Sequence, residues 1–270
     1  MPVLVTGVED AVGRSAVRRL VRGGGEVRVF LDLERPDVAD PAPFRALGCM
    51  VARGALDDEG HLETALEQVH TVAHLAGTPL DDPGRLLDAA ATVLSAAIGA
   101  GCRRFVALSH LGADDPSGNP WLEACAAVED LLADAPLETV VFRRALTYGP
   151  DDAWTAALVG GAAGGLGRRG GGRHAPLFAD DLAGAVAASD RERTAGGGAD
   201  LHLAVAIAGP DRLGLVELVR ALRGEPTAGR ADGPLPAHAA DLLTRELLPP
   251  AGAIGESGTP FAEGLRRLGS

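Results

Sequence analysis

The sequence predicts an α/β fold in which helices cover both faces of a parallel sheet. Short apolar runs alternate with longer segments of helical periodicity from residue 2 to residue 142, and this alternation is typical of βαβ units. The first apolar run ends in a glycine-containing turn that leads directly into the first helical segment. With 270 residues, of which 46% are hydrophobic, the chain is long enough to bury one substantial core.

The spacing of apolar residues predicts the strands and helices of the first half. Apolar runs rich in valine, leucine and phenylalanine predict strands at residues 2–6, 26–31, 49–52, 71–75, 104–108 and 138–142. Apolar residues that recur every three or four positions predict helices at residues 11–21, 62–69, 86–100 and 121–133. Because parallel strands need helical crossovers, this order predicts a doubly wound sheet.

The turn after the first strand has the spacing of a dinucleotide-binding fingerprint. In such a turn the first glycine permits the bend, the second lets the backbone approach a pyrophosphate, and the third allows close packing of helix on strand. Gly7 and Gly13 fill the first and third places, but Asp10 fills the second. The turn therefore predicts a Rossmann-type fold, whereas a negative side chain at position 10 argues against a bound dinucleotide.

The pattern loosens after residue 150. Residues 160–172 are too rich in glycine for a stable element and are expected to form a loop. Helices are expected near residues 181–189, 213–222, 237–247 and 261–268, and a strand near residues 201–206. We therefore divide the chain into a Rossmann-type core at residues 1–150 and a small C-terminal substrate lobe at residues 151–270, packed together as one structural unit.

Composition restricts the partners. The formal net charge is -12, which disfavours nucleic acid and anionic membranes and leaves a small molecule as the expected ligand. No apolar run approaches the roughly 20 residues of a membrane span, and no basic, apolar export signal precedes the first strand. The cysteines, Cys49, Cys102 and Cys125, lack metal-ligand spacing. We therefore expect a reduced, cytoplasmic protein without a metal.

The chain contains no lysine, since all 25 basic residues are arginine, and Tyr148 is its one tyrosine. Other short motifs follow the strands in order: Thr6-Gly7…Gly13, His74-Leu75-Ala76-Gly77, Leu108-Ser109, Arg143…Tyr148-Gly149-Pro150, Phe178-Ala179-Asp180-Asp181-Leu182-Ala183, and Phe261-Ala262-Glu263-Gly264-Leu265-Arg266-Arg267. Together they resemble the short-chain dehydrogenase/reductase superfamily, on its extended and atypical side, which includes NAD-dependent epimerase/dehydratase and NmrA-like proteins.

The resemblance implies a catalytic Ser, Tyr and Lys, of which one remains. Ser109 matches the serine, but Trp121 falls at the tyrosine position and Cys125 at the lysine position. An indole is not an acid–base group at neutral pH, and a thiol does not replace a fixed cation. We therefore expect that the usual hydride chemistry of the superfamily is lost.

The resemblance also places the candidate binding residues. The cofactor side would be formed by Gly7, Asp10, Gly13, Asp32, Ala76 and Gly77, and the substrate pocket by Trp121, Cys125, Arg144, Tyr148, His174 and Phe178. The cofactor itself stays open; Asp32 at the end of the second strand favours NAD over NADP, because a carboxylate bonds a ribose diol and repels a 2′-phosphate. The alternative is that Asp32 is a surface turn residue.

Three functions are compatible with these residues. The favoured one is a non-redox enzyme, such as a cyclase, isomerase, dehydratase or lyase of secondary metabolism, in which Ser109 and His110 carry the chemistry. The first alternative is a non-catalytic ligand- or nucleotide-binding protein of NmrA-like type, in which both residues are structural. The second is an NAD-dependent oxidoreductase or epimerase with another proton donor, such as His110. The resemblance also implies a possible homodimer through the helices beside the active site.

Overall fold

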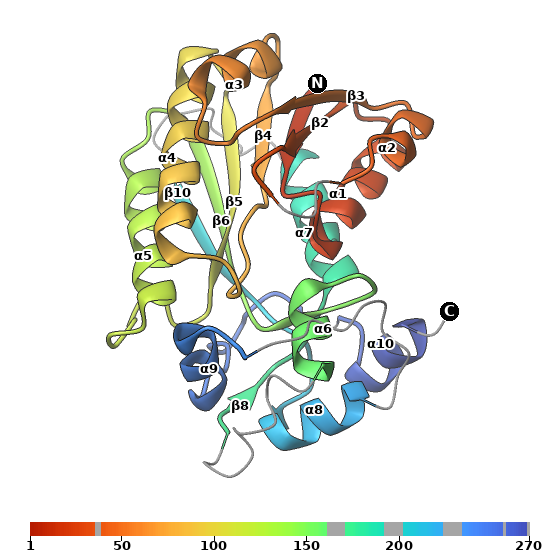
Figure 1. Ribbon diagram of the computed structural model, residues 1–270, viewed down its shortest axis with the longest axis vertical. Coiled ribbons are helices and arrows are strands. Elements are labelled where there is room, and N and C mark those ends of the chain that lie inside the picture. The colour runs from red at the N-terminus through yellow and green to blue at the C-terminus, as the bar shows by residue number, and fades with distance from the viewer. Residues whose placement is uncertain (36–38, 161–170, 192–201, 224–233, 256–257, 269–270) are drawn as a thin grey trace.

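A seven-stranded parallel sheet forms the centre of the computed structural model, which describes residues 1–35, 39–160, 171–191, 202–223, 234–255 and 258–268. Its strands are β1 (Val3–Thr6), β2 (Val27–Asp32), β3 (Met50–Gly54), β4 (Thr71–His74), β5 (Arg104–His110), β6 (Glu138–Arg144) and β10 (His202–Ile207), in the spatial order β10-β6-β5-β4-β1-β2-β3. Every neighbouring pair in this sheet is parallel. The predicted doubly wound Rossmann-type sheet is confirmed (Figure 1).

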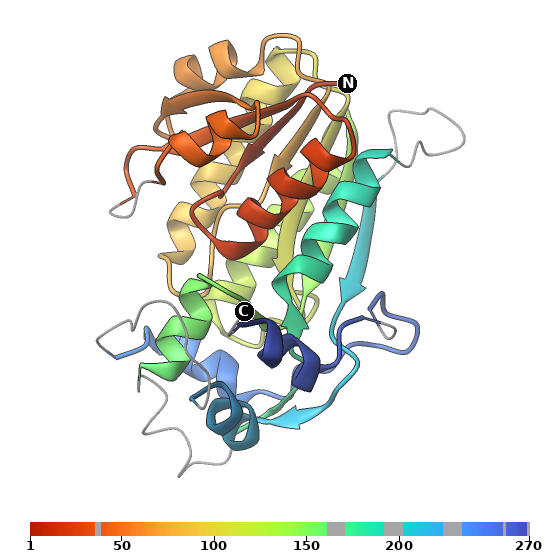
Figure 2. The ribbon, with the colours of Figure 1, turned by 90° about the vertical axis from the view of Figure 1, so that its right-hand side faces the viewer.

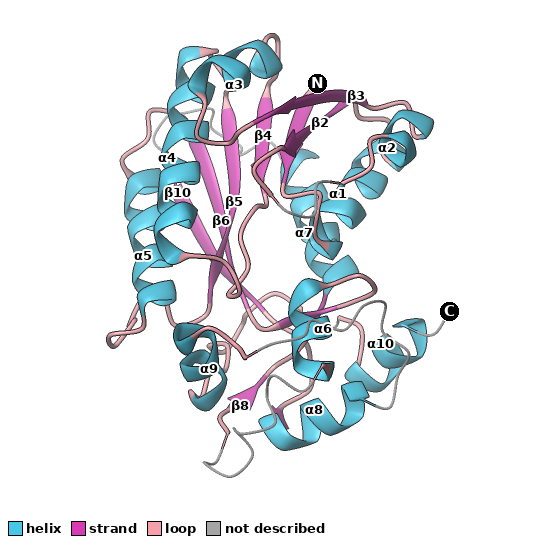
Figure 3. Ribbon diagram, in the orientation of Figure 1, coloured by secondary structure: helices cyan, strands magenta, loops and turns pink. Residues whose placement is uncertain are grey.

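Helices cover both faces of the sheet. One face carries α3 (Glu59–Leu66), α4 (Pro83–Gly99) and α5 (Pro120–Ala133), and the other carries α1 (Ala11–Arg22), α7 (Ala179–Arg191) and the short α2 (Ala42–Ala46). α4 and α5 each begin at a proline, and each follows a residue, Asp82 or Asn119, whose side chain accepts backbone N–H groups of the first turn. α1 packs along α7 in front of the sheet (Figure 2). Figure 3 shows the resulting layers.

The remaining elements gather beyond the carboxyl ends of the strands. They are α6 (Ala153–Val159), α8 (Leu215–Arg223), α9 (Ala237–Thr244), α10 (Phe261–Leu268), and two short ladders in which β7 (Thr147–Tyr148) pairs with β9 (Leu177–Phe178) and β8 (Arg173–His174) with β11 (Leu213–Gly214). These helices bury a hydrophobic cluster of their own. Meanwhile β10 and α7, which follow residue 150, belong to the main sheet and its helical layer.

The structure differs from the predicted elements mainly in the second half. The helix predicted at 213–222 begins at Leu215, because Leu213 and Gly214 pair with β8. The helix predicted at 237–247 ends at Thr244. The predicted loop at 160–172 lies largely outside the described residues, which resume at 171. Within the described ranges, no helix combines the length and the apolar character needed to cross a bilayer.

Candidate functional site

A cleft of about 390 Å³ opens beside the carboxyl ends of β1, β2 and β4. The strand order reverses between β1 and β4, and open α/β sheets bind ligands at such a point. The cleft is lined by Asp32, Arg35, Leu56, Asp57, His74, Ala76, Gly77, Asp81, Asp82, Arg85, Leu86, Asp88 and Ala89. Three of the predicted cofactor residues, Asp32, Ala76 and Gly77, therefore lie together in one cleft.

The turn between β1 and α1 requires both of its glycines. Gly7 has a φ of +72°, and a Cβ there would lie 2.4 Å from the backbone nitrogen of Ala76. A Cβ at Gly13 would lie 2.1 Å from the carbonyl oxygen of Gly7. Real side chains do not tolerate such distances, so the turn keeps the tight bend and the close helix–strand packing of the fingerprint.

Asp10, at the second glycine position, connects the turn to α6. Asp10 precedes α1, but its side chain caps no N–H group of that helix. Instead, its Oδ1 accepts a 3.4 Å hydrogen bond from the backbone N–H of Ala153. The neighbouring Asp152 is buried, and its Oδ2 accepts 2.6 Å bonds from the backbone N–H and the hydroxyl of Thr155. Burial and the charge of Asp10 raise the pKa of Asp152 to about 8.

Two buried acidic residues, Asp32 and Glu9, lie at the end of β2. Asp32 is buried, and its backbone N–H donates to Oε1 of the buried Glu9 at 3.3 Å. Burial raises the pKa of Glu9. The Asp32 carboxylate accepts the N–H of Glu34 at 3.1 Å and lies 3.9 Å from the Arg85 guanidinium. Asp32 is therefore a buried polar residue that faces the cleft, not an exposed turn residue.

Ser109 lies at the end of β5 and is hydrogen-bonded to an ion pair in which Glu129 is buried and Arg143 is partly exposed. Its hydroxyl donates a 2.5 Å hydrogen bond to Oε1 of Glu129 on α5. Glu129 also accepts from Nε of Arg143 at 3.0 and 2.9 Å and from its Nη2 at 2.6 Å. Arg143 on β6 is the register partner of Ser109. The Ser109 hydroxyl therefore links β5 to α5 and through Glu129 to β6.

The sequence reasoning missed Glu129, although a signal for it exists. Trp121, Cys125 and Glu129 are spaced by four residues, so they share one face of α5, and all three are buried. A carboxylate on the buried face of a helix requires a partner, and Arg143 supplies it.

His110 and Cys125 are buried groups whose charged forms are disfavoured. Nδ1 of His110 lies 2.9 Å from the carbonyl oxygen of Leu111, and burial lowers the pKa of His110 to about 3. Burial raises the pKa of the Cys125 thiol to about 12. At neutral pH the imidazole is therefore uncharged and the thiol is protonated.

Trp121 fills the tyrosine position with a buried indole. Its ring lies against Gly77, where an added Cβ would be 3.5 Å from the indole, and it stacks on the His238 ring at 6.4 Å between centroids. Its Nε1 is buried and has no hydrogen-bond partner among the described residues. Beside it, Nη2 of the buried Arg144 donates to the carbonyl oxygen of Gly77 at 2.8 Å. The loop after β4 is thus held by both Trp121 and Arg144.

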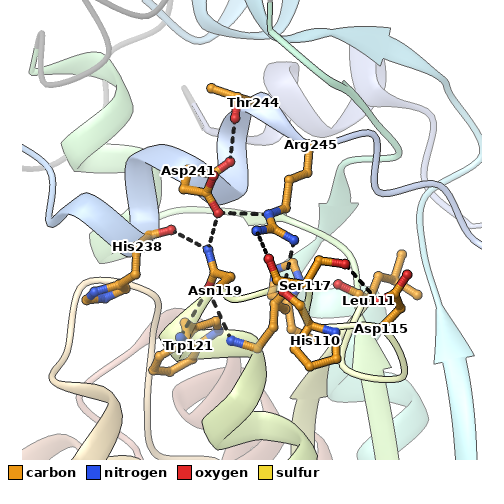
Figure 4. Close-up of polar contacts among 12 residues, drawn as sticks. His110, Leu111, Asp115, Ser117, Asn119, Trp121, His238, Asp241, Thr244 and Arg245 are labelled. Carbon is orange, nitrogen blue, oxygen red and sulfur yellow. Dashed lines mark hydrogen bonds and ion pairs between the residues drawn. The ribbon is translucent and has the colours of Figure 1, made fainter.

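α9 is fastened to the start of α5 by a polar network (Figure 4). Nδ2 of Asn119 donates to the carbonyl oxygen of His238 at 2.9 Å and to Oδ2 of Asp241 at 2.7 Å. Arg245 donates to the same Asp241 oxygen at 2.8 Å and to the carbonyl oxygens of Pro116 and Ser117. The network holds His238 over Trp121.

The other predicted pocket residues divide between two places. His174 is buried with its Nε2 3.1 Å from the carbonyl oxygen of Leu243, and burial lowers its pKa. Tyr148 is fully buried, and its ring contacts Phe178 at 5.5 Å and Phe261 at 4.9 Å. Tyr148 and Phe178 therefore lie together in the C-terminal hydrophobic cluster, whereas Ser109, Cys125 and Trp121 lie at β5 and α5.

Comparison with known proteins places this geometry in a family. A family described as NAD(P)H-binding matches residues 7–153, more than half of the chain. The chain belongs to the NAD(P)H-binding family. Ceramide reductase of Caulobacter vibrioides (strain NA1000 / CB15N) is 30% identical over 160 residues, which make up 58% of this chain and 49% of that protein. The chain thus spans about half the length of this curated relative.

Solved structures of epimerases and dehydratases share the fold. UDP-glucose 4-epimerase of Thermus thermophilus, solved in complex with NAD, is 22% identical and superposes with a TM-score of 0.72 over 100% of this chain and 97% of the other. The dTDP-glucose 4,6-dehydratase of Streptomyces venezuelae, solved as a double mutant with NAD, is 20% identical with a TM-score of 0.72 over 99% and 95%. The fold that the resemblance implies is therefore confirmed, and the family match confirms its NAD(P)H-binding character.

The residues fit one half of the family's dinucleotide better than the other. Membership of the family supports a nucleotide ligand. At the adenosine end, Asp32 and the apolar side chains of Leu56, Leu86 and Ala89 line an open cleft. At the turn before α1, Asp10 stands where the fingerprint has its second glycine, so a charged side chain is added beside the N–H groups that would approach the phosphates. The adenosine half therefore fits, and the diphosphate half does not.

Proposed function

We propose that this protein is a ligand-binding member of its family that uses the cleft between β2 and β4 to bind an adenine-containing small molecule and does not catalyse hydride transfer. The observation that carries the proposal is the packed centre at Trp121 and Cys125. Both side chains are buried, and they occupy the places of the acid–base pair that the resemblance implies. A sensing or regulatory role, as in NmrA-like relatives, accords with a cleft that can bind the adenosine part of a nucleotide but lacks the tyrosine–lysine pair that the resemblance implies.

The state of the neighbouring groups supports this proposal over an enzyme. General acid–base catalysis works best when the pKa of the catalytic group lies near the working pH. The pKa of His110 is lowered to about 3 and that of Cys125 is raised to about 12, both by burial. The Ser109 hydroxyl already donates to a carboxylate that is paired with Arg143. These groups are arranged as a buried structural network.

A non-redox enzyme is the second candidate, and one contact favours it. The 2.5 Å hydrogen bond from Ser109 to Glu129 gives the serine hydroxyl a carboxylate that accepts a proton in principle. A cyclase, isomerase, dehydratase or lyase of secondary metabolism would use this pair with a small organic substrate. An oxidoreductase that replaces the tyrosine by His110 has the weakest support, because the buried imidazole is neutral and bonded to the Leu111 carbonyl.

Asp32 bears on the choice between NAD and NADP within the family. A carboxylate at the end of β2 bonds a ribose diol and repels a 2′-phosphate. Asp32 is buried there and lines the cleft, with Glu34 two residues later. These two acidic residues therefore favour a ligand with a free ribose diol, such as that of NAD, over one with a 2′-phosphate, such as that of NADP.

The test combines a binding and an activity measurement on the purified protein. Calorimetric titration with adenosine and NAD measures binding in the cleft, and formation of reduced nicotinamide from NAD and a panel of alcohols measures hydride transfer. We expect binding of adenosine without any enzyme-dependent reduced nicotinamide. As a control, Asp32→Asn removes the carboxylate from the cleft and should weaken adenosine binding. Oxidation of an alcohol in proportion to the protein would overturn the proposal.

A further inference from the structure

The cleft carries a strong negative charge. Asp32, Asp57, Asp81, Asp82 and Asp88 all line it, against Arg35 and Arg85. Both arginines already face carboxylates, since Arg35 lies 3.4 Å from Asp81 and Arg85 lies 3.9 Å from Asp32 and 3.7 Å from Glu34. A cleft with this charge attracts cationic ligands, repels phosphates and does not oppose neutral ligands.

His74 supplies an unpaired polar atom in the lining. It is 3% exposed, and its Nδ1 lies 2.9 Å from the hydroxyl of Thr6. Its Nε2 has no hydrogen-bond partner in the part of the chain that the structure describes, and the residue lines the cleft. Burial lowers the pKa of His74 to about 4, so the ring is neutral at physiological pH. Because His74 lines the cleft, its unpaired Nε2 is available to hydrogen-bond an uncharged polar group of a ligand.

The negative charge continues from the cleft to the first turn. Glu9 contacts the backbone N–H of Asp32, and Asp10 follows it at the start of α1. The N-terminus of the first helix is the site at which this fold binds a diphosphate, because its free N–H groups and its dipole favour an anion. Here Asp10 stands at that N-terminus, and its carboxylate accepts the N–H of Ala153 at the start of α6 instead of an N–H of α1. The protein therefore places a carboxylate next to the N-terminus at which the fold would bind a diphosphate.

We infer that the cleft selects an adenine nucleoside whose 5′ position carries a neutral or cationic group, and that Asp10 excludes a 5′-diphosphate. The inference rests on the proposed binding function and specifies its ligand class. In this fold the ribose lies at the end of β2 and the 5′ substituent extends toward the first turn. With this placement Asp32 would bond the ribose diol. The 5′ substituent would approach the turn that carries Asp10, whose charge favours an ammonium and repels a phosphate.

Calorimetric titration of the full chain with four probes tests this selection: adenosine, 5′-amino-5′-deoxyadenosine, ADP and NAD. For the wild-type protein we expect the two nucleosides to bind at least about tenfold more tightly than ADP and NAD, a difference of about 1.4 kcal/mol. Asp10→Gly should strengthen ADP and NAD binding by about tenfold and leave adenosine within about twofold. Asp10→Asn separates charge from bulk, because it removes only the charge.

Asp130→Asn is the matched control, since it removes one carboxylate from an exposed position on α5. It should change none of the four affinities, and unfolding curves of all three variants show whether they are folded. Wild-type binding of ADP or NAD as tight as that of adenosine, or no gain in Asp10→Gly, would overturn the inference and leave the binding function standing. Failure of all four probes to bind would overturn both.

Discussion

Replacing Glu129 by glutamine tests whether the centre at β5 and α5 is structural. The substitution keeps the size and shape of the side chain and removes its charge. Glu129 is 7% exposed and pairs with Arg143, which is 29% exposed. The carboxylate accepts hydrogen bonds from Arg143 and from Ser109. In Glu129→Gln, one acceptor oxygen becomes an NH₂ group that faces the N–H groups of Arg143.

The expected cost is about 2 kcal/mol of unfolding free energy. Removing one partner of a fully buried ion pair costs roughly 3–5 kcal/mol. Arg143 is partly exposed and also lies 3.8 Å from Asp114, so solvent and a second carboxylate reduce the penalty. For a chain of this size, about 2 kcal/mol lowers the melting temperature by roughly 4–8 °C.

Urea unfolding followed by circular dichroism measures the change, and Glu263→Gln is the matched control. Glu263 pairs with Arg267 one turn away on α10, and both are 40% exposed or more. That substitution should cost at most about 0.5 kcal/mol. If Glu129→Gln were as stable as the wild type or more stable, the buried charge would be a destabilising feature retained for chemistry, and the non-redox enzyme would become the better interpretation.

Buried groups give three further predictions. Asp152 has a raised pKa, so its stabilising contribution is complete below about pH 4 and is lost as the pH rises toward about 8. The free energy of unfolding should fall by up to about 1.4 kcal/mol per pH unit over that range. In urea unfolding, Asp152→Asn should lack this decline, and an equal decline in both proteins would refute the assignment. The Cys125 thiol should resist alkylation in the native state at pH 8 and react after denaturation, as mass spectrometry of the labelled peptide would show; rapid native labelling would contradict its burial. Gly264→Ala places a Cβ 2.0 Å from the Tyr148 hydroxyl, and thermal unfolding should show a loss of about 1–3 kcal/mol; an unchanged melting temperature would show that α10 shifts freely.

The core strands could be predicted because they are buried on both faces. Every residue of β4 and β5 is buried, and such strands appear in sequence as continuous apolar runs. The short ladders could not be predicted in the same way. β7 pairs with β9 and β8 with β11, so each depends on a partner some thirty or more residues away rather than on a local pattern. The start of α8 was misplaced for that reason.

The candidate site was predictable where the turn dictates it and not where distant segments meet. Gly7 and Gly13 predict the first turn. The four-residue spacing along one helix shows that Trp121 and Cys125 stand where the resemblance implies the tyrosine and the lysine. The contact between Asp10 and Ala153 joins residues 143 positions apart. The sequence shows that Asp10 puts a negative charge where the fingerprint has a glycine. Only the fold shows that the Asp10 carboxylate accepts the N–H of Ala153.

The residues that depart from the family pattern make specific contacts of their own in this fold. Asp10 gains the N–H of Ala153, and the indole of Trp121 is stacked by His238, which Asn119 holds in place. Random loss of a catalytic residue would leave cavities or unpaired charges at the old site, each of which costs stability. Here the Asp10 carboxylate has a donor and the Trp121 ring has a stacking partner, although the Trp121 Nε1 has no hydrogen-bond partner among the described residues. These contacts accord with the proposed binding function, in which the cleft binds the ligand and the centre at β5 and α5 is structural.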